Sequence, residues 1–276
     1  MRTLYNPDTL NHPGNKYEHP DRLKGFLMHP ISPIDEKEAL KAINNLYTGG
    51  RINLDKLKRT AQHKATVAET RLSPKSIGAI IASVSLSIQA ARDGDFALTR
   101  PPGHHANLER PSGFCLINNL AVAVNQELIQ GHKVAVIDFD GHIGDGTQSI
   151  FADQDRVLCC SLHQEGTFGA HKRIRGKNIF NIPIPAKSND QIFIESIKKF
   201  LDRIKDFRPD VIAISAGFDG CEGDPLLDLA FSKRGYHSCG KLIAQMGIRT
   251  FAVLEGGYHN QLKECIQSFI SGFNQQ

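Results

Sequence analysis

The chain has 276 residues, of which 40% are hydrophobic and 22% are charged, and its formal net charge is +4. This balance is ordinary for a globular protein and allows a core of useful size. Basic residues gather only at 171–177 and without interleaved aromatic residues, so no direct nucleic-acid binding is expected. No apolar run approaches the about 20 residues of a membrane span, and no secretory segment is visible, which predicts a cytoplasmic protein without a membrane partner.

Alternating strand and helix patterns predict an α/β fold in which residues 1–276 form one domain. The first 70 residues show no clear pattern. Five prolines before position 34 predict that much of the opening segment is irregular, and Gly49-Gly50 could mark a loop between N-terminal helices. Beyond them, short β-branched runs predict strands buried on both faces, and longer patterns between them predict helices. In chain order these are helix 74–92, strand 96–99, helix 116–130, strand 134–140, strand 157–163, helix 190–207, strand 211–219, helix 229–246, strand 250–257 and helix 261–273.

Six cysteines are present, and none forms a CxxC pair. Their spacing predicts neither a disulfide framework nor a zinc ribbon. Buried free thiols in a reducing compartment are expected instead.

Polar residues cluster just after the predicted strands. The carboxyl ends of parallel strands meet at one edge of a sheet, where ligands bind in open α/β folds. The sequence therefore predicts a functional site at that edge, built from His104, His105, Asp140, His142, Asp219 and Tyr258.

The segment at 138–142 offers three metal ligands in five residues. In an extended chain Asp138, Asp140 and His142 would share one face, and Asp219 ends another buried strand. Three protein ligands with an open position are typical of catalytic zinc, although two carboxylates and an imidazole also suit iron(II) or cobalt. The alternative is that Asp140 and Asp219 only cap helices. Leaving such carboxylates unpaired would be costly, which favours the metal.

Tandem histidines follow a Pro-Pro-Gly turn, and their imidazoles titrate near neutral pH. His104 and His105 are therefore candidates for acid–base chemistry, with Asp138 and Asp145 available to fix their tautomers. Tyr258 follows two glycines and could donate a hydrogen bond to an oxyanion. Taken singly, each could instead be structural.

Together these segments resemble the histone deacetylase and acetylpolyamine amidohydrolase family, in a class II-like form. The resemblance implies an arginase-like, mostly parallel sheet with helices on both faces. It covers most of the chain through RPPGHHA at 100–106, SGFCLINN at 112–119, VIDFDGHIGDGTQ at 136–148, SLHQ at 161–164, ISAGFDGCEGDPL at 214–226, VLEGGYH at 253–259 and HPDR at 19–22.

The resemblance also implies roles. His105 would be the general base and then the acid toward a metal-activated water, and Tyr258 would polarise the acetyl carbonyl. The zinc ligands would be Asp140, His142 and Asp219, while His104 would pair with Asp138 and His105 with Asp145. Substrate contacts would come from Phe114 and Phe168 in the tunnel, Leu226 at its rim and Arg22 in an inner cavity.

A structural potassium ion is a further implication of the resemblance. Its ligands would be the side chains of Asp138 and Ser161 and the carbonyls of Asp140, His142 and Leu162. The sequence departs from the family pattern at Ile143, where a second histidine is usual.

Three functions compete: an active deacetylase, a relative that only binds acetylated ligands, and another metal amidohydrolase. The complete set of ligands, histidines and tyrosine favours the deacetylase. Its expected partner is an acetylated protein, peptide or small amine, with acetyl-lysine ahead of acetylpolyamines because Leu226 puts no charge at the rim. Glu109 remains an alternative contact for a cation. The sequence does not predict an oligomeric state.

Overall fold

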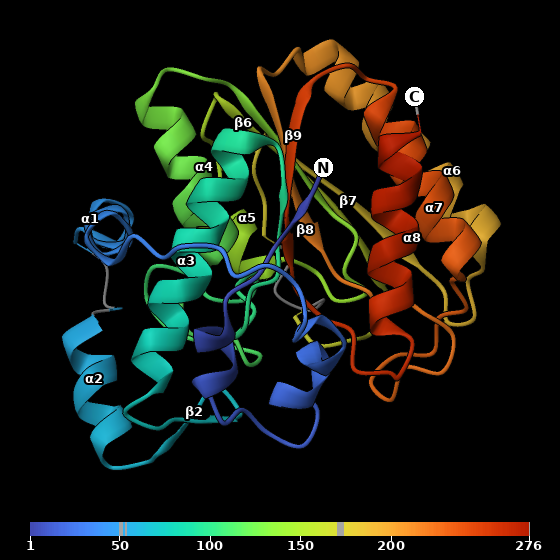
Figure 1. Ribbon diagram of the computed structural model, residues 1–276. Helices are drawn as coiled ribbons and strands as arrows, with labels where there is room; N and C mark the ends of the chain where they lie inside the picture. The colour runs from blue at the N-terminus through green and yellow to red at the C-terminus, as the bar shows by residue number, and fades with distance from the viewer. Residues whose placement is uncertain (50–51, 53, 170–173, 276) are drawn as a thin grey trace.

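A seven-stranded parallel sheet forms the centre of the computed structural model (Figure 1), which describes residues 1–49, 52, 54–169 and 174–275. The strand order is β1-β4-β9-β8-β5-β6-β7, and every neighbouring pair is parallel. The strands are β1 Thr3–Leu4, β4 Phe96–Ala97, β5 Val134–Asp138, β6 Val157–Gln164, β7 Ile179–Ile184, β8 Val211–Ala216 and β9 Arg249–Leu254. This sheet confirms the predicted α/β fold.

Helices cover both faces of the sheet, as predicted (Figure 1). On one face α3 and α4 pack against Val134 and Val136 of β5, and on the other α6, α7 and α8 share a core with Ala135 and Ile137. This alternation follows from the two-residue period of a strand. The helices are α1 Glu36–Tyr47, α2 Leu54–Gln62, α3 Ser76–Asp93, α4 Asn119–Ile129, α5 Asp145–Phe151, α6 Asp190–Phe207, α7 Lys233–Ala244 and α8 Leu262–Asn274.

The strand register brings the carboxyl ends of the central strands together. Asp138 on β5 is in register with Ser161 on β6 and with Ser215 on β8, and Ser215 is in register with Val253 on β9. The loops that leave these strands therefore start side by side, at the edge where open α/β sheets bind ligands.

Two predicted strands extend too far. Strand β5 ends at Asp138 rather than 140, because the Asp138 carboxylate accepts a hydrogen bond from the Asp140 N–H and turns the chain. Strand β8 likewise ends at Ala216 rather than 219. The argument that Asp138, Asp140 and His142 alternate along an extended strand is thus wrong, and a turn presents them instead.

Helix α7 also differs from its prediction, since it begins at Lys233 and not at 229. The Ser232 side chain caps it by accepting hydrogen bonds from the N–H groups of Arg234 and Gly235. Phe231, just before it, bridges to Cys221 instead of joining the helix.

Some elements lacked a clear pattern in the sequence. Strand β7 lies at the sheet edge, is mostly half-buried and contains Pro183, so no continuous apolar run marks it. Strand β1 and the hairpin strands, β2 Thr66–Val67 and β3 Thr70–Arg71, have only two residues each. Helix α5 was not predicted, and helices α1 and α2 were anticipated only as N-terminal helices without bounds.

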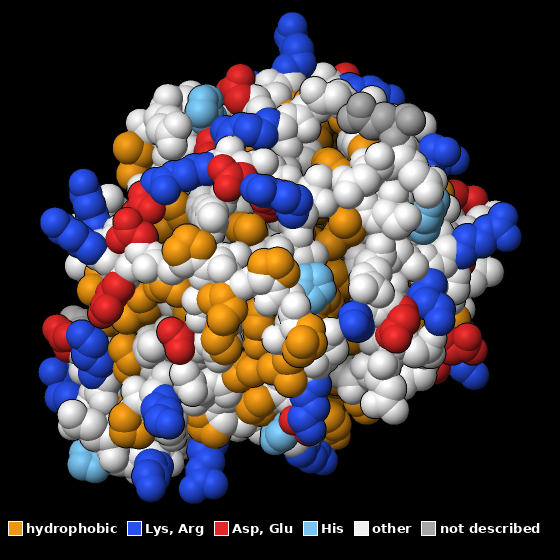
Figure 2. Space-filling model, in the orientation of Figure 1, with side chains coloured by type: hydrophobic (Ala, Val, Ile, Leu, Met, Phe, Trp, Pro, Cys, Tyr) orange, Lys and Arg blue, Asp and Glu red, His pale blue; other side chains and the backbone are white. Residues whose placement is uncertain are grey.

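Lysine and arginine side chains are spread over the face seen in Figure 2, with acidic side chains among them. Residues 171–173 of the basic stretch lie outside the described part of the chain. Among described helices, none combines the length and apolar character needed to cross a membrane. All six cysteines are buried free thiols, as predicted.

Candidate active site

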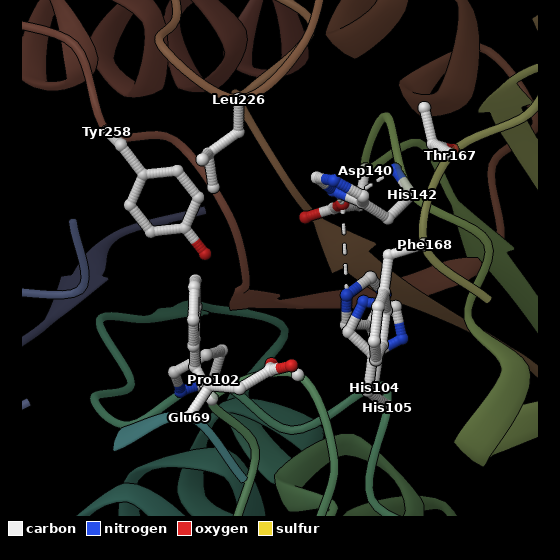
Figure 3. A pocket seen from close by; sticks show the side chains of 12 residues that line it. Glu69, Pro102, His104, His105, Asp140, His142, Thr167, Phe168, Leu226 and Tyr258 are labelled. Carbon is white, nitrogen blue, oxygen red and sulfur yellow. Dashed lines mark hydrogen bonds and ion pairs between the residues drawn. The ribbon is translucent and has the colours of Figure 1, made fainter. Parts of the chain in front are cut away.

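A cavity of about 360 Å³ lies among the loops that leave the carboxyl ends of the strands (Figure 3). Eight of the predicted site residues line it. The complete lining is Glu69, Pro102, His104, His105, Gly113, Phe114, Asp140, His142, Thr167, Phe168, Leu226 and Tyr258. The predicted Asp138, Asp145 and Asp219 do not line the cavity but are hydrogen-bonded to residues that do.

The three predicted metal ligands converge. His142 Nδ1 lies 2.7 Å from Asp219 Oδ2 and 3.2 Å from Asp140 Oδ1. The second oxygen of each carboxylate is held by a backbone amide, with Gly256 N–H donating to Asp140 Oδ2 and Gly141 N–H to Asp219 Oδ1, both at 2.7 Å. One oxygen of each carboxylate is therefore fixed, and the other faces the imidazole.

This donor set fits a divalent metal ion. Asp140 and Asp219 are 1% and 0% exposed, and burial together with the Asp140 charge raises the pKa of Asp219. Two buried carboxylates this close need a compensating positive charge. Glycines at positions 217 and 256 make space for the Asp140 carboxylate, because a Cβ on Gly217 or Gly256 would collide with Asp140 Oδ2. Oxygen and imidazole nitrogen ligands are those that zinc takes in catalytic sites.

Each tandem histidine has its own carboxylate. His104 Nδ1 bonds Asp138 Oδ2 at 3.0 Å, and His105 Nδ1 bonds Asp145 Oδ1 at 2.6 Å. In a neutral imidazole, an Nδ1–H that donates to a carboxylate leaves Nε2 with a lone pair, which is the tautomer that a proton acceptor needs. The predicted pairs are thus present in the geometry.

The two imidazoles differ in electrostatics. Burial disfavours a charged His104, but the Asp140 and Asp138 carboxylates outweigh burial and raise its pKa well above the ordinary value. Burial, followed by the charge on His104, lowers the pKa of His105 to about 4. His105 is therefore neutral at neutral pH and can accept a proton.

Tyr258 points its hydroxyl into the cavity, opposite His142 and the tandem histidines (Figure 3). Its backbone N–H donates to Asp224 Oδ2 at 2.7 Å, and its ring packs edge-on against Phe114. Burial raises the pKa of the phenol well above 10, so the hydroxyl keeps its proton and remains a donor.

Arg22 lies behind Tyr258 and does not line this cavity. Its guanidinium sits 4.7 Å from the centre of the Tyr258 ring and donates to the carbonyls of Gly257 and Glu255 at 2.8 and 2.6 Å. These contacts hold the tyrosine loop. The predicted contact of Arg22 with a departing product stays a prediction.

Phe114, Phe168 and Leu226 line the cavity together. The Phe168 ring stands edge-on to His105 at 5.1 Å between ring centres. Ile143, the departure from the family pattern, is 2% exposed and lies under Gly169, next to Phe168. An apolar side chain there packs against the loop that carries Phe168.

The sequence did not point to Glu69. It follows Ala68 in the two-residue turn of the β2–β3 hairpin, and both residues have positive φ. Phe114, also at positive φ, donates its N–H to Ala68 O at 2.8 Å. A two-residue hairpin turn of this kind requires positive φ at both of its residues, and its bond to Phe114 holds Glu69 at the cavity. No sequence signal marks an Ala-Glu turn.

Two other residues had been considered. Glu109 does not line the cavity, and belongs to a separate hollow with Arg110 and Pro111. Ser161 lies beside Asp138 in the sheet register and accepts a hydrogen bond from Gly144 N–H. This arrangement does not test the predicted potassium ion.

Comparison with known proteins identifies the family. Residues 34–273 match the model of the histone deacetylase domain. The chain belongs to this family. It is 32% identical to an uncharacterised protein of Methanocaldococcus jannaschii, over 99% of the chain and 87% of that protein. It is 36% identical to an acetylpolyamine amidohydrolase of Burkholderia pseudomallei, over 67% of the chain but only 58% of that relative.

A solved structure supports the same family. The crystal structure of an acetylpolyamine aminohydrolase from Burkholderia pseudomallei has a TM-score of 0.82 with 26% identity, and the match covers 100% of this chain and 99% of that one. The predicted family is therefore confirmed, and so is its hydrolase class, deacetylase or amidohydrolase. Membership also indicates a divalent metal, typically zinc, for which Asp140, His142 and Asp219 are a candidate ligand set.

Proposed function

We propose that residues 1–276 form the catalytic domain of a zinc-dependent deacetylase that hydrolyses the acetyl amide of an acetylated amine. Acetyl-lysine in a protein or peptide is the expected substrate. The observation that carries the proposal is the convergence of three kinds of group on one cavity. These are the ligands Asp140, His142 and Asp219, the paired histidines and the Tyr258 hydroxyl.

A divalent ion held by the three ligands would supply Lewis-acid activation of the acetyl carbonyl and of the attacking water. His105 accepts the proton of that water at Nε2, because Asp145 holds its Nδ1–H and the imidazole is neutral. His105 then returns the proton to the leaving amine. His104 lies beside it, with its Nδ1 bonded to Asp138 and its Nε2 3.8 Å from Asp140 Oδ1.

Tyr258 stabilises the negative charge that develops on the carbonyl oxygen. Its protonated hydroxyl faces the histidines across the cavity, and Arg22, Phe114 and Asp224 fix its ring and backbone. A donor held in place before the reaction costs no reorganisation when the charge appears. Phe114 and Phe168 would accommodate the methylene chain of the acylated amine.

A second candidate substrate is an acetylated polyamine. The prediction against it was based on the uncharged rim residue Leu226, whereas the acidic side chain of Glu69 also lines the cavity. A carboxylate at that position would attract the free ammonium group of such a substrate. The acetylpolyamine amidohydrolase named above supports the same candidate.

Measuring acetate release distinguishes the proposed deacetylase from a protein that only binds acetylated ligands. Purified protein supplied with zinc should release acetate from acetyl-lysine peptides or acetylspermidine. Asp219→Asn should lose turnover and the ion held with Asp140 and His142, while remaining folded. Iron(II) should be tried in parallel, because the donor set also suits it. Absence of bound metal, with no turnover on either substrate after zinc or iron is added, would contradict the proposal.

A further inference from the structure

A second cluster of metal-ligand side chains lies outside the proposed active site. Cys221 follows β8, His259 follows Tyr258, and Cys265 lies in the first turn of α8. One ligand atom of each residue lies within 4.8 Å of the other two. Cys221 and Cys265 are 3% and 0% exposed, and His259 is partly exposed. The catalytic reaction proposed above uses none of the three.

The sulfur separation fits metal binding. Cys221 Sγ and Cys265 Sγ are 3.6 Å apart. Two thiolates bound to one tetrahedral zinc at about 2.3 Å each are about 3.8 Å apart, so hardly any movement is needed. A disulfide would require the sulfurs to approach to about 2.05 Å. Two thiolates with an imidazole are also a preferred donor set for zinc, whereas a disulfide needs no imidazole.

His259 has the hydrogen bond that a ligating histidine normally makes. Its Nε2 lies 2.9 Å from the carbonyl oxygen of Phe218, which can only accept. Nε2 therefore donates to this carbonyl, and the imidazole also interacts with the Cys221 side chain. Histidines that bind metals usually donate their other N–H in this way, to a carboxylate or a backbone carbonyl. Nδ1 accepts a longer bond of 3.2 Å from Gln261 N–H, which water can replace because Gln261 is exposed.

We propose that Cys221, His259 and Cys265 bind one zinc ion at a site separate from the proposed catalytic centre. The fourth position would take water from the hollow of about 460 Å³ that His259 lines with Tyr258 and Leu262. The ion would join the loop that carries Asp219 to helix α8, which follows the Tyr258 loop. Its role is to hold these two loops in register, and it takes no part in the hydrolysis.

Cadmium titration under reducing conditions tests this site without an activity assay. Cadmium reports thiolate binding through a sulfur-to-metal charge-transfer band in the ultraviolet, which the carboxylate–imidazole set cannot produce. The full chain and Asp219→Asn should both show the band at one ion per chain. Zinc should compete with cadmium for the site.

Two variants and a matched control decide the assignment. Loss of a ligand in His259→Ala or Cys265→Ala should weaken binding by more than the roughly 10–100-fold that loss of an outer-shell partner costs. Cys159→Ala, which removes a buried thiol on β6 outside the cluster, should leave the band unchanged. His259 is partly exposed, so its variant keeps the test valid if Cys265→Ala does not fold. An absent band, or one that survives His259→Ala, overturns the proposal. Counting free thiols in the absence of reductant gives a further check. A count two lower than the six cysteines would reveal a disulfide and would also overturn the proposal.

Discussion

The carboxylate of Glu255 accepts a hydrogen bond from the backbone N–H of His104 at 3.1 Å. The same oxygen accepts a second bond from Gly103 N–H at 2.7 Å, and Ser215 Oγ donates to the other oxygen at 3.1 Å. One buried side chain thus connects the turn of the tandem histidines to the strand end that leads to Tyr258. The backbone of the tandem-histidine turn therefore depends on a residue three positions before Tyr258.

Replacing Glu255 by Gln should lower kcat/KM about tenfold, because a neutral amide oxygen accepts the two backbone bonds more weakly than a carboxylate does. KM should change little, since Glu255 does not line the cavity. Steady-state kinetics, with thermal unfolding to confirm folding, measures this. Glu127→Gln removes another buried carboxylate, the partner of Arg249, and should not affect turnover. A normal kcat in Glu255→Gln would show that this support does not position the histidines.

His105→Ala should lower kcat by roughly 10²–10⁴, because no other neutral imidazole accepts the proton in its place. His163 is a matched control, since it is also buried and burial also lowers its pKa to about 4. It lies on β6 and does not line the cavity. His163→Ala should therefore affect stability more than kcat. Equal losses of kcat in the two variants would mean that the proton acceptor is wrongly assigned.

Glu69→Gln should lower kcat/KM for acetylspermidine by roughly two- to fivefold, the strength of an exposed ion pair, and added salt should reduce the difference. Hydrolysis of a neutral acetyl-lysine analogue should not change. Steady-state kinetics on both substrates would measure these changes, with Glu109→Gln as a control outside the cavity. The ratio of the two wild-type kcat/KM values also tests the expected preference for acetyl-lysine. A higher kcat/KM for acetylspermidine would contradict that preference.

His12 should make the folded state sensitive to acid. It is fully buried between Ser76 Oγ and Thr70 Oγ1, and burial, with the charge of Arg100, lowers its pKa to about 3. In the unfolded chain its pKa is about 6.5, so the unfolded state binds the extra proton between these values. The stabilisation is complete above pH 6.5 and is lost as pH falls toward 3.

Chemical denaturation should therefore show about 2 kcal/mol less stability at pH 5 than at pH 7.5 from this residue. His12→Gln should be less stable at pH 7.5 but should have a shallower decline, whereas the exposed His63→Gln should follow wild type. A decline as steep in His12→Gln as in wild type would place the acid sensitivity elsewhere.

The sequence was most informative where one physical effect dominated. Buried strands such as β5 were recognisable because both their faces are apolar, and the 3.6-residue pattern predicted α6 with its observed bounds. That each tandem histidine needs a carboxylate could be anticipated because each imidazole needs a fixed tautomer, whereas the pairing of His104 with Asp138 and of His105 with Asp145 followed from the family resemblance. In contrast, the turn after Asp138 depends on a side-chain hydrogen bond, which periodicity does not register.

Contacts between residues far apart in the chain also limited what could be predicted from the sequence. Glu69 reaches the cavity only because its hairpin turn is bonded to Phe114, 45 positions later in the chain by their numbers. Glu255 looked like part of a glycine-rich turn, and its support of His104 spans 151 positions. Pairings of this kind follow from the strand order, which local patterns do not determine.

The central claim is that the Tyr258 hydroxyl stabilises an oxyanion during amide hydrolysis. The direct measurement is kcat for acetate release by wild type and Tyr258→Phe, alongside the dissociation constant of a hydroxamate that binds the metal. The account predicts a fall of about 10²–10³ in kcat, with a much smaller change in hydroxamate affinity. Contradiction would come from a wild-type protein that turns over no acetylated amine, with Tyr258→Phe altering only ligand affinity.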